Sequence, residues 1–191
     1  MTGSPTISAA SWPSEPSETS AAAKDDHAEA WAGIVIEPVA AGHAQALAEL
    51  FERNRVPAVS DSFDPFPLTA EEARRITLEP RLDAYFVASL EAELIAMSML
   101  RGFDEGFTVP SFGIFVDHRH HRGGVGRRLT AWTVEEARRR GCAAIRLSVY
   151  ASNEVALRLY RSLGFEEQER AVVARATGLD EKIVMTRSLE A

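Results

Sequence analysis

The chain has a single cysteine, Cys142, so it cannot form an intramolecular disulfide. Cys142 follows Gly141 at the start of an apolar segment, which favours a small core side chain over a nucleophile. No apolar run reaches the roughly 18 residues that identify a membrane-spanning helix. The N-terminus also lacks the basic start and the apolar core of a secretory signal peptide. Together these absences predict a cytoplasmic protein with no membrane partner.

The first 32 residues differ in composition from the rest of the chain. They are crowded with Ser, Pro, Ala and Thr and show no sustained apolar period, which is typical of a disordered tail. Five acidic residues against one lysine give this tail a charge of −4, out of −7 for the whole chain. The remaining domain, residues 33–191, is therefore only mildly acidic, and we expect no nucleic-acid partner.

No complete metal-binding pattern is present. His118, His120 and His121 lie close together, but no second group of ligands follows at zinc spacing. We therefore expect no metal site.

Two familiar nucleotide-binding patterns are also incomplete. A P-loop needs Gly-Lys-Ser/Thr, whereas Gly126 is followed by Arg127 and Arg128. A Rossmann fingerprint needs a third glycine where Leu129 stands, and an acid at the end of the next strand, which residues 143–150 do not supply.

The most informative segment is residues 112–128, FGIFVDHRHHRGGVGRR. An apolar strand leads into a basic, glycine-rich turn and then into a helix. Gly123, Gly124 and Gly126 allow the backbone to bend sharply and to bring its N–H groups close to a ligand, and the helix start adds unpaired N–H groups. The pattern predicts a pyrophosphate site, although an ordinary glycine loop is the alternative.

A second cluster covers residues 152–166, SNEVALRLYRSLGFE. Asn153 is placed to cap a helix that ends at Gly164. The apolar face of this helix is predicted to contain Val155, Ala156, Leu159, Tyr160 and Leu163. On periodicity alone, Tyr160 is an aromatic of the buried face.

The other segments complete a mixed α/β pattern. The expected order is one strand, two helices, three strands, a helix, a strand, a helix and two strands. This order predicts an α/β (α+β) fold with a mostly antiparallel sheet of six or seven strands and about four helices. The expected strands are 33–36, 85–89, 94–100, one ending at Val116, 144–149, 165–174 and 182–186; the expected helices include 41–53 and one capped by Thr69.

The two clusters, in this order, resemble the GNAT superfamily of acyl-CoA-dependent N-acetyltransferases over roughly residues 33–188. The resemblance implies that acetyl-CoA is the cosubstrate, that the turn binds its pyrophosphate, and that Tyr160 protonates the leaving thiolate. One position departs from the family pattern, because His121 stands where Arg or Gln is usual. The resemblance implies cofactor contacts from Ile114, Phe115, Val116, His121, Arg122, Gly123, Gly124, Val125, Gly126, Arg127, Asn153 and Tyr160.

The implied reaction is direct transfer of an acetyl group to an amine in a ternary complex. The amine must lose a proton first, and the strand 111–116 carries no carboxylate to accept it. Asp104, Glu105, Asp61 and Asp64 are candidate bases, although each is typical of a solvated turn. A backbone N–H near Phe115 is expected to stabilise the oxyanion.

The acceptor remains open between a small amine, an amino sugar, an antibiotic and a peptide or protein N-terminus. The segment 63–68, FDPFPL, supplies two aromatics and two prolines that suit either a pocket wall or a self-anchored loop. A non-catalytic acyl-CoA-binding regulatory domain is the alternative function, and a nucleotide-phosphate module unrelated to coenzyme A is a third. A homodimer is also left open.

Overall fold

The computed structural model describes residues 33–190, apart from residues 64, 122 and 177. The predicted tail, residues 1–32, lies outside the described residues. The described chain forms one seven-stranded sheet in the order β1-β2-β3-β4-β5-β7-β6, which confirms the predicted mixed sheet. Its strands are β1 (Ile34–Pro38), β2 (Ala84–Leu90), β3 (Glu93–Arg101), β4 (Ser111–Val116), β5 (Ala144–Tyr150), β6 (Glu166–Arg175) and β7 (Gly178–Ser188).

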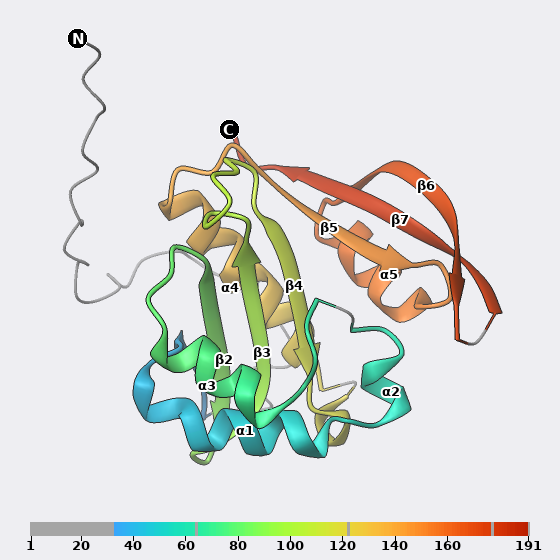
Figure 1. Ribbon diagram of the computed structural model, residues 1–191. Helices are drawn as coiled ribbons and strands as arrows, with labels where there is room; N and C mark the ends of the chain where they lie inside the picture. The colour runs from blue at the N-terminus through green and yellow to red at the C-terminus, as the bar shows by residue number, and fades with distance from the viewer. Residues whose placement is uncertain (1–32, 64, 122, 177, 191) are drawn as a thin grey trace, which may run out of the picture. The chain divides into compact units, whose positions relative to one another are not determined.

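The sheet is divided at the junction of β4 and β5. Every other neighbouring pair is antiparallel, whereas β4 and β5 are parallel and share a single pair of opposed residues, Ser111 and Arg146. The Arg146 N–H donates to the Pro110 carbonyl at 3.1 Å. Beyond this point the two strands separate, and Figure 1 shows β5, β7 and β6 turning away from β4. Past this junction, the facing edges of β4 and β5 therefore have no strand partner among the described residues.

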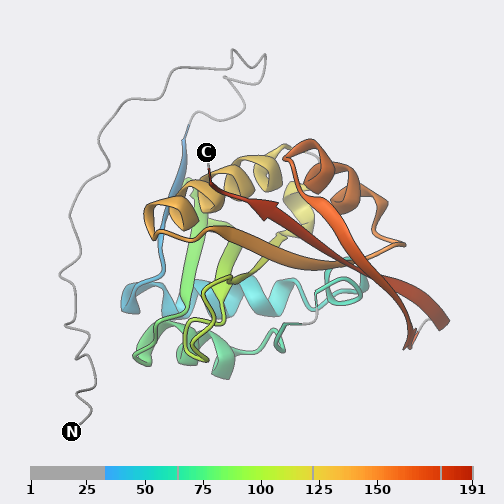
Figure 2. The same ribbon diagram turned by 90° about the horizontal axis from the view of Figure 1, so that it is seen from above.

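Helices cover both faces of the sheet (Figure 2). One face carries α4 (Val125–Arg139) and α5 (Glu154–Ser162); the other carries α1 (Ala44–Arg53), α2 (Pro57–Ser60) and α3 (Ala70–Leu78), and the 3-10 helices are η2 (Ala41–His43) and η3 (His118–His120). Side chains alternate along β4, so that Phe112 joins the core beneath α4 and α5, whereas Phe115 joins the core beneath α1 and α3. Strand β4 thus contacts both apolar layers.

The predicted helix signals are largely confirmed. The Thr69 hydroxyl accepts the Glu72 N–H at 3.2 Å, but the Glu72 carboxylate pairs with Arg75. The short helix α2 was not predicted, because a single turn opened by Pro57 leaves no periodic pattern. The prediction for Val155 is wrong, since this side chain is 70% exposed and the buried positions of α5 are Leu157 and Tyr160. In α5, Leu157 and Tyr160 are three residues apart and lie on the same side of the helix, and this side faces the core.

A buried carboxylate ties the end of β4 to neighbouring elements. The Asp117 side chain is fully buried and accepts hydrogen bonds from Arg53 Nε of α1 at 2.5 Å and from Arg119 Nη2 at 2.9 Å. Arg53 also donates to the Leu94 carbonyl of β3. Burial alone would raise the pKa of the Asp117 carboxyl, but the hydrogen bonds from Arg119 and Arg53 outweigh it and hold that pKa well below its usual range. The ion pairs of Asp117 with Arg53 and Arg119 therefore hold the turn that follows β4 in place.

We expect Asp117→Asn to lower the free energy of unfolding by about 3 kcal/mol at pH 7, because it leaves two guanidinium groups without their buried partner. A carboxyl with a depressed folded pKa stabilises the fold above its unfolded pKa of about 4, and this stability is lost as the pH falls through the folded value. The difference between wild type and variant should shrink between pH 5 and pH 3 in urea titrations. Asp61→Asn, at an exposed position, is the control. A loss that stays constant with pH would contradict the assignment.

Candidate active site

The free edge of β4 can be oriented residue by residue. The Asp117 N–H donates to the carbonyl of Ile95 on β3 at 2.8 Å, and Ile95 lies opposite Asp117 in the antiparallel register. Backbone groups two residues apart point the same way, so those of Phe115 also face β3. The N–H and C=O groups of Ile114 and Val116 therefore face the opening toward β5.

This orientation changes what β4 offers to a ligand. The predicted backbone contacts named Ile114, Phe115 and Val116, but the Phe115 backbone is directed at β3 and its ring lies 5.8 Å from the Phe51 ring, in the other core. The Phe115 N–H, expected as an oxyanion donor, is therefore directed away from the opening, and the N–H groups of Ile114 and Val116 are the ones that face it. The alternation of a strand could have shown this only if the pairing of β4 with β3 had been known.

The glycine turn leads directly into α4. Gly124 is the residue before the helix and has a left-handed φ of 73°, a conformation that favours glycine. It offers no capping side chain, and the Arg128 N–H donates to the Gly124 carbonyl at 3.2 Å as a first bond of the helix. In a helix the N–H groups of the first turn lack internal acceptors. The N–H groups of Val125, Gly126 and Arg127 are thus directed out of the helix start, where its dipole is positive.

Side chains of the turn connect it to the rest of the site. His121 Nε2 lies 3.1 Å from the Val116 carbonyl, so a protonated Nε2 donates to the last residue of β4. Arg127 Nη2 donates to the Ser162 hydroxyl of α5 at 2.7 Å. A side-chain Cβ built on Gly126 would stand 3.7 Å from Leu159, which shows how closely α5 approaches the turn. The predicted contact from Arg122 lies outside the described residues.

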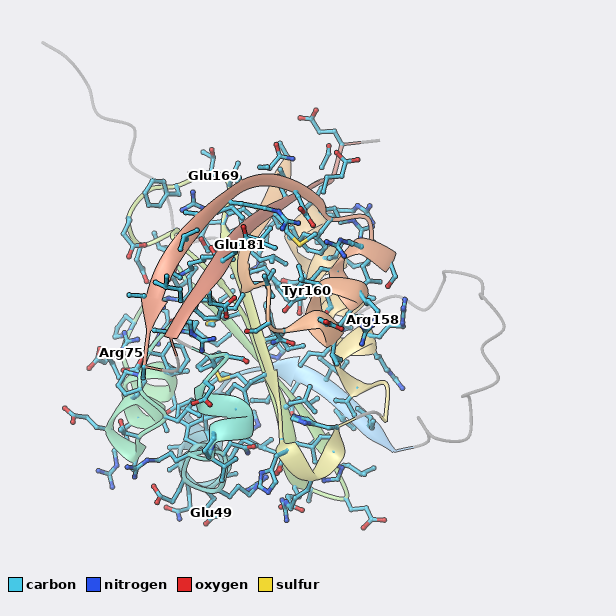
Figure 3. The ribbon with its side chains drawn as sticks, turned by 90° about the vertical axis from the view of Figure 1, so that its right-hand side faces the viewer. Glu49, Arg75, Arg158, Tyr160, Glu169 and Glu181 are labelled. Atoms are coloured by element: carbon cyan, nitrogen blue, oxygen red, sulfur yellow. The ribbon has the colours of Figure 1, made fainter. Side chains whose placement is uncertain are left out.

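Helix α5 brings the second cluster to the opening. The Asn153 Oδ1 accepts the Ala156 N–H at 3.2 Å, as the predicted cap requires. Tyr160 is about two turns further on and only 8% exposed, and Figure 3 shows it on the inner side of α5 while Arg158 points outward. Its ring centroid lies 6.2 Å from that of Phe112 on β4 and 5.6 Å from that of Phe165. Tyr160 thereby lies beside the β4–β5 junction.

Burial raises the pKa of the Tyr160 hydroxyl above its ordinary value, so the group stays protonated at neutral pH. The described residues offer it no hydrogen-bond partner. Among these residues the fully enclosed side-chain nitrogen or oxygen atoms that lack a partner belong only to Arg81 and Arg101. The Tyr160 hydroxyl is therefore protonated and has a hydrogen bond to donate.

A second opening lies on the opposite face of the sheet, at the same junction. It is a depression of about 260 Å³ that contains Phe112 and Gly113 of β4, Arg146 of β5, Arg101 of β3, and Glu105 from the loop before β4. Of the four candidate bases, only Glu105 lines it. Asp104 instead accepts the Leu82 N–H at 2.7 Å, Asp61 is exposed elsewhere, and Asp64 lies outside the described residues. The structure thus separates Glu105 from the other candidates.

The aromatic loop before α3 is anchored by its own rings. Phe63 meets Phe115 at 5.0 Å and Phe66 at 5.2 Å, both edge to face, and Phe66 lies 5.8 Å from Phe51. These contacts favour the self-anchored interpretation for both aromatics. Pro65 is the residue of the loop that lines the depression described above.

The described residues lack both a membrane-spanning helix and a cluster of metal ligands. No helix among them is both long enough and apolar enough to cross a bilayer. In the same part of the chain, no three His, Cys, Asp or Glu side chains gather as metal ligands would. The ring of His118 lies against another side chain, with its Nδ1 3.3 Å from Asn54 Oδ1.

A parted sheet with a glycine turn and a helix start beside the opening defines the class of fold that the sequence indicated. A model of the Acetyltransferase (GNAT) family matches residues 44–165, which is more than half of the chain. The chain therefore belongs to the GNAT acetyltransferase family, and the predicted resemblance is confirmed.

Named relatives include the [ribosomal protein bS18]-alanine N-acetyltransferases of Escherichia coli K12 and Salmonella typhimurium. Each is 40% identical over 76 residues, which cover 39% of this chain and 51% of the relative. The chain thus matches about half the length of these relatives.

Solved structures match the fold over most of the chain. A GCN5-related N-acetyltransferase from Kribbella flavida superposes with a TM-score of 0.70 at 24% identity, over 83% of this chain and 99% of that one. The E. coli ribosomal-protein-S18-alanine N-acetyltransferase gives 0.66 at 22% identity, over 83% and 95%. The yncA protein of S. typhimurium, solved with its cofactor acetyl-CoA, gives 0.66 at 20% identity, over 83% and 95%.

Sequence reasoning missed two arginines of the depression, Arg101 and Arg146. Both lie on strands, one at the end of β3 and one early in β5, in segments far apart in the chain. Arg146 interrupts an otherwise apolar run at an outward-facing position, which is a weak signal. Only the pairing of Ser111 with Arg146 brings them to one opening.

We expect Gly124→Ala to cost about 1–2 kcal/mol of unfolding free energy, because a residue with a side chain is strained at a φ of 73°. Gly123→Ala is the matched control, since a Cβ there meets nothing closer than 3.6 Å. Thermal and urea unfolding of the two variants measure the difference. Equal stabilities would show that the turn does not require the left-handed conformation.

Proposed function

We propose that the protein transfers an acetyl group from acetyl-CoA to a primary amine by direct attack in a ternary complex. One observation supports this above the others: the free edge of β4 runs toward the uncapped start of α4. In acetyl-CoA a pantetheine arm joins the thioester to the pyrophosphate. The arm can lie along the free edge of β4 while the pyrophosphate lies at the start of α4. Membership of the GNAT family supports the same cosubstrate.

In this proposal the backbone N–H groups of Val125, Gly126 and Arg127 bind the pyrophosphate, and Gly123 and Gly124 leave room for it. His121 contributes a further donor once its ring leaves the Val116 carbonyl, and Arg122 belongs to the same basic turn. The backbone groups of Ile114 and Val116 pair with the pantetheine arm. One of these groups, the Val116 carbonyl, is contacted by His121 in the structure. Asn153 flanks the arm from the start of α5.

The chemistry follows from these positions. The ammonium group of the acceptor loses a proton, and the lone pair of the amine attacks the thioester carbon. The tetrahedral oxyanion accepts a hydrogen bond from an N–H group on the edge of β4. The C–S bond then breaks and the nitrogen loses its second proton to solvent, which yields the amide and coenzyme A thiolate. Glu105, directly or through water, is the described carboxylate placed to take the ammonium proton.

The role of Tyr160 is narrowed by its raised pKa. A thiol has a pKa near 8.5, so full proton transfer from a phenol above 10 to the thiolate runs uphill. A hydrogen bond from the protonated hydroxyl to the sulfur stabilises the leaving group without that transfer. The thiolate then takes its proton from the medium.

The acceptor, the location, the oligomeric state and the domain division of this protein are also proposals. Its acceptor is an amine, and a protein N-terminus is among the candidates because relatives carry the name of ribosomal-protein alanine acetyltransferases. The cytoplasmic location, the homodimer, and the division into a tail at 1–32 and a catalytic domain at 33–191 stay predictions. The non-catalytic acyl-CoA-binding domain is the alternative, and a protonated Tyr160 hydroxyl beside the β4–β5 junction favours the enzyme over it.

We expect Tyr160→Phe to lower kcat about 10- to 100-fold, the value of one hydrogen bond to a charged group, with the Kd for acetyl-CoA unchanged. Gly124→Glu should abolish acetyl-CoA binding, because it places a carboxylate at the pyrophosphate position. Calorimetric titration with acetyl-CoA, together with thiol release over a panel of amines, measures both effects.

Three outcomes decide the matter. Binding with thiol release that Tyr160→Phe slows supports the proposal. Binding without release on any amine favours the regulatory domain. An unchanged affinity in Gly124→Glu, or displacement of acetyl-CoA by ATP, would contradict the assignment of the turn.

A further inference from the structure

The depression beside the β4–β5 junction is lined by charged side chains of both signs. Two guanidinium groups, Arg101 and Arg146, and one carboxylate, Glu105, line about 260 Å³ together with apolar surface. Sites for drug-sized molecules occupy about 300–1,000 Å³, so this one suits a small molecule. Phe112 of β4 is one of its lining residues, and the ring of the same residue contacts Tyr160 on the other face, so the depression adjoins the proposed reaction site across the strand.

Arg101 is held in place but not fully engaged. Its Nη1 donates to the Pro65 carbonyl at 3.0 Å, and its Nε is enclosed without a hydrogen-bond partner. Asp83 Oδ2 lies 3.7 Å from this Nε, which is too long for a hydrogen bond. The other oxygen of Asp83 accepts the Gly102 N–H at 2.7 Å and the Phe103 N–H at 2.9 Å. Asp83 thus fixes the loop more than it neutralises Arg101.

Arg146 lies across the junction from Arg101. Its Nε donates to the Ser111 hydroxyl at 3.2 Å, and its guanidinium carbon lies 5.9 Å from the centre of the Phe107 ring. Among the described residues, no acidic side chain pairs with Arg146. The guanidinium is therefore fixed at one edge by neutral neighbours and keeps its charge for another group.

The loop that carries Glu105 is closed against the strands. The Phe107 N–H donates to the Gly102 carbonyl at 2.8 Å, and Gly102 has a left-handed φ of 108°. A Cβ on Gly102 would stand 3.1 Å from the Phe107 ring, so glycine lets this ring fold over the loop. Glu105 is thereby presented to the same opening as the two arginines.

We propose that the acceptor is a small zwitterionic amine of the amino-acid class, whose carboxylate is bound by Arg101 and Arg146. This inference rests on the proposed acetyl transfer and names its substrate class. Two guanidinium groups suit a carboxylate, and Glu105 supplies the opposite charge for the ammonium group. The ammonium group then loses one proton to Glu105, directly or through water, and the amine attacks the thioester carbon. As the C–S bond breaks, the nitrogen loses its second proton to solvent, the thiolate is released and an N-acetyl amino acid forms. A peptide N-terminus, whose α-carboxylate is an amide, leaves the arginines unpaired.

The test compares free L-amino acids with their carboxamides and with short peptides of the same first residue. The amine of a carboxamide has the lower pKa, so unassisted chemistry at pH 7 favours the carboxamide. Acetylation rates and calorimetric binding to the coenzyme A-loaded protein are both measured. The proteins are wild type, Arg101→Gln, Arg146→Gln and, as a matched control, Arg74→Gln on the exposed side of α3.

We expect at least one free amino acid to bind at least tenfold more tightly than its carboxamide. Arg146→Gln and Arg101→Gln should each raise its KM tenfold or more, while Arg74→Gln and the Kd for acetyl-CoA stay unchanged. Carboxamides or peptides that bind as tightly as the acids, or arginine variants without effect, would overturn this inference and leave acetyl transfer intact. Selective carboxylate binding without thiol release would support the pocket and contradict the transferase.

Discussion

The parting of two parallel strands governs the arrangement of every proposed functional group. Strands β4 and β5 meet at one pair of residues, Ser111 and Arg146, and then diverge. Because β4 is still paired with β3 on its other side, its free N–H and C=O groups belong to alternate residues only. An extended ligand can complete that edge as a missing strand would. The unpaired backbone groups of the two edges cost folding free energy, but the same groups are available to bind a chain-like cofactor.

The surrounding elements keep this opening in place. Asp117, buried between Arg53 and Arg119, fixes the turn at the end of β4, and Gly124 directs that turn into the start of α4. Arg127 joins the start of α4 to Ser162 of α5, so that the helix carrying Tyr160 approaches the same opening. One face of the junction thereby receives the cofactor proposed here. The other face holds the charged depression proposed for the acceptor.

The sequence predicted most of this arrangement where local chemistry decides it. Glycine spacing, the Asn153 cap and apolar periodicity are local signals, and they located the turn, α5 and nearly every strand. Pairing is not local, so neither the orientation of the Phe115 backbone nor the meeting of Arg101 with Arg146 was predictable. Val155 was misjudged for a related reason, because only packing decides which apolar residues of a short helix stay exposed. The choice of Glu105 among four acidic residues likewise required the folded loop.

The central claim is that acetyl-CoA binds along the free edge of β4 and at the start of α4. Amide hydrogen exchange, resolved by residue with and without acetyl-CoA, tests it most directly. The account predicts that the N–H groups of Val116, Gly126 and Arg127 gain protection on binding, while that of Phe115, already directed at β3, changes little. Protection that appears at Phe115 and not at Val116, or at no residue of the turn, would contradict the account.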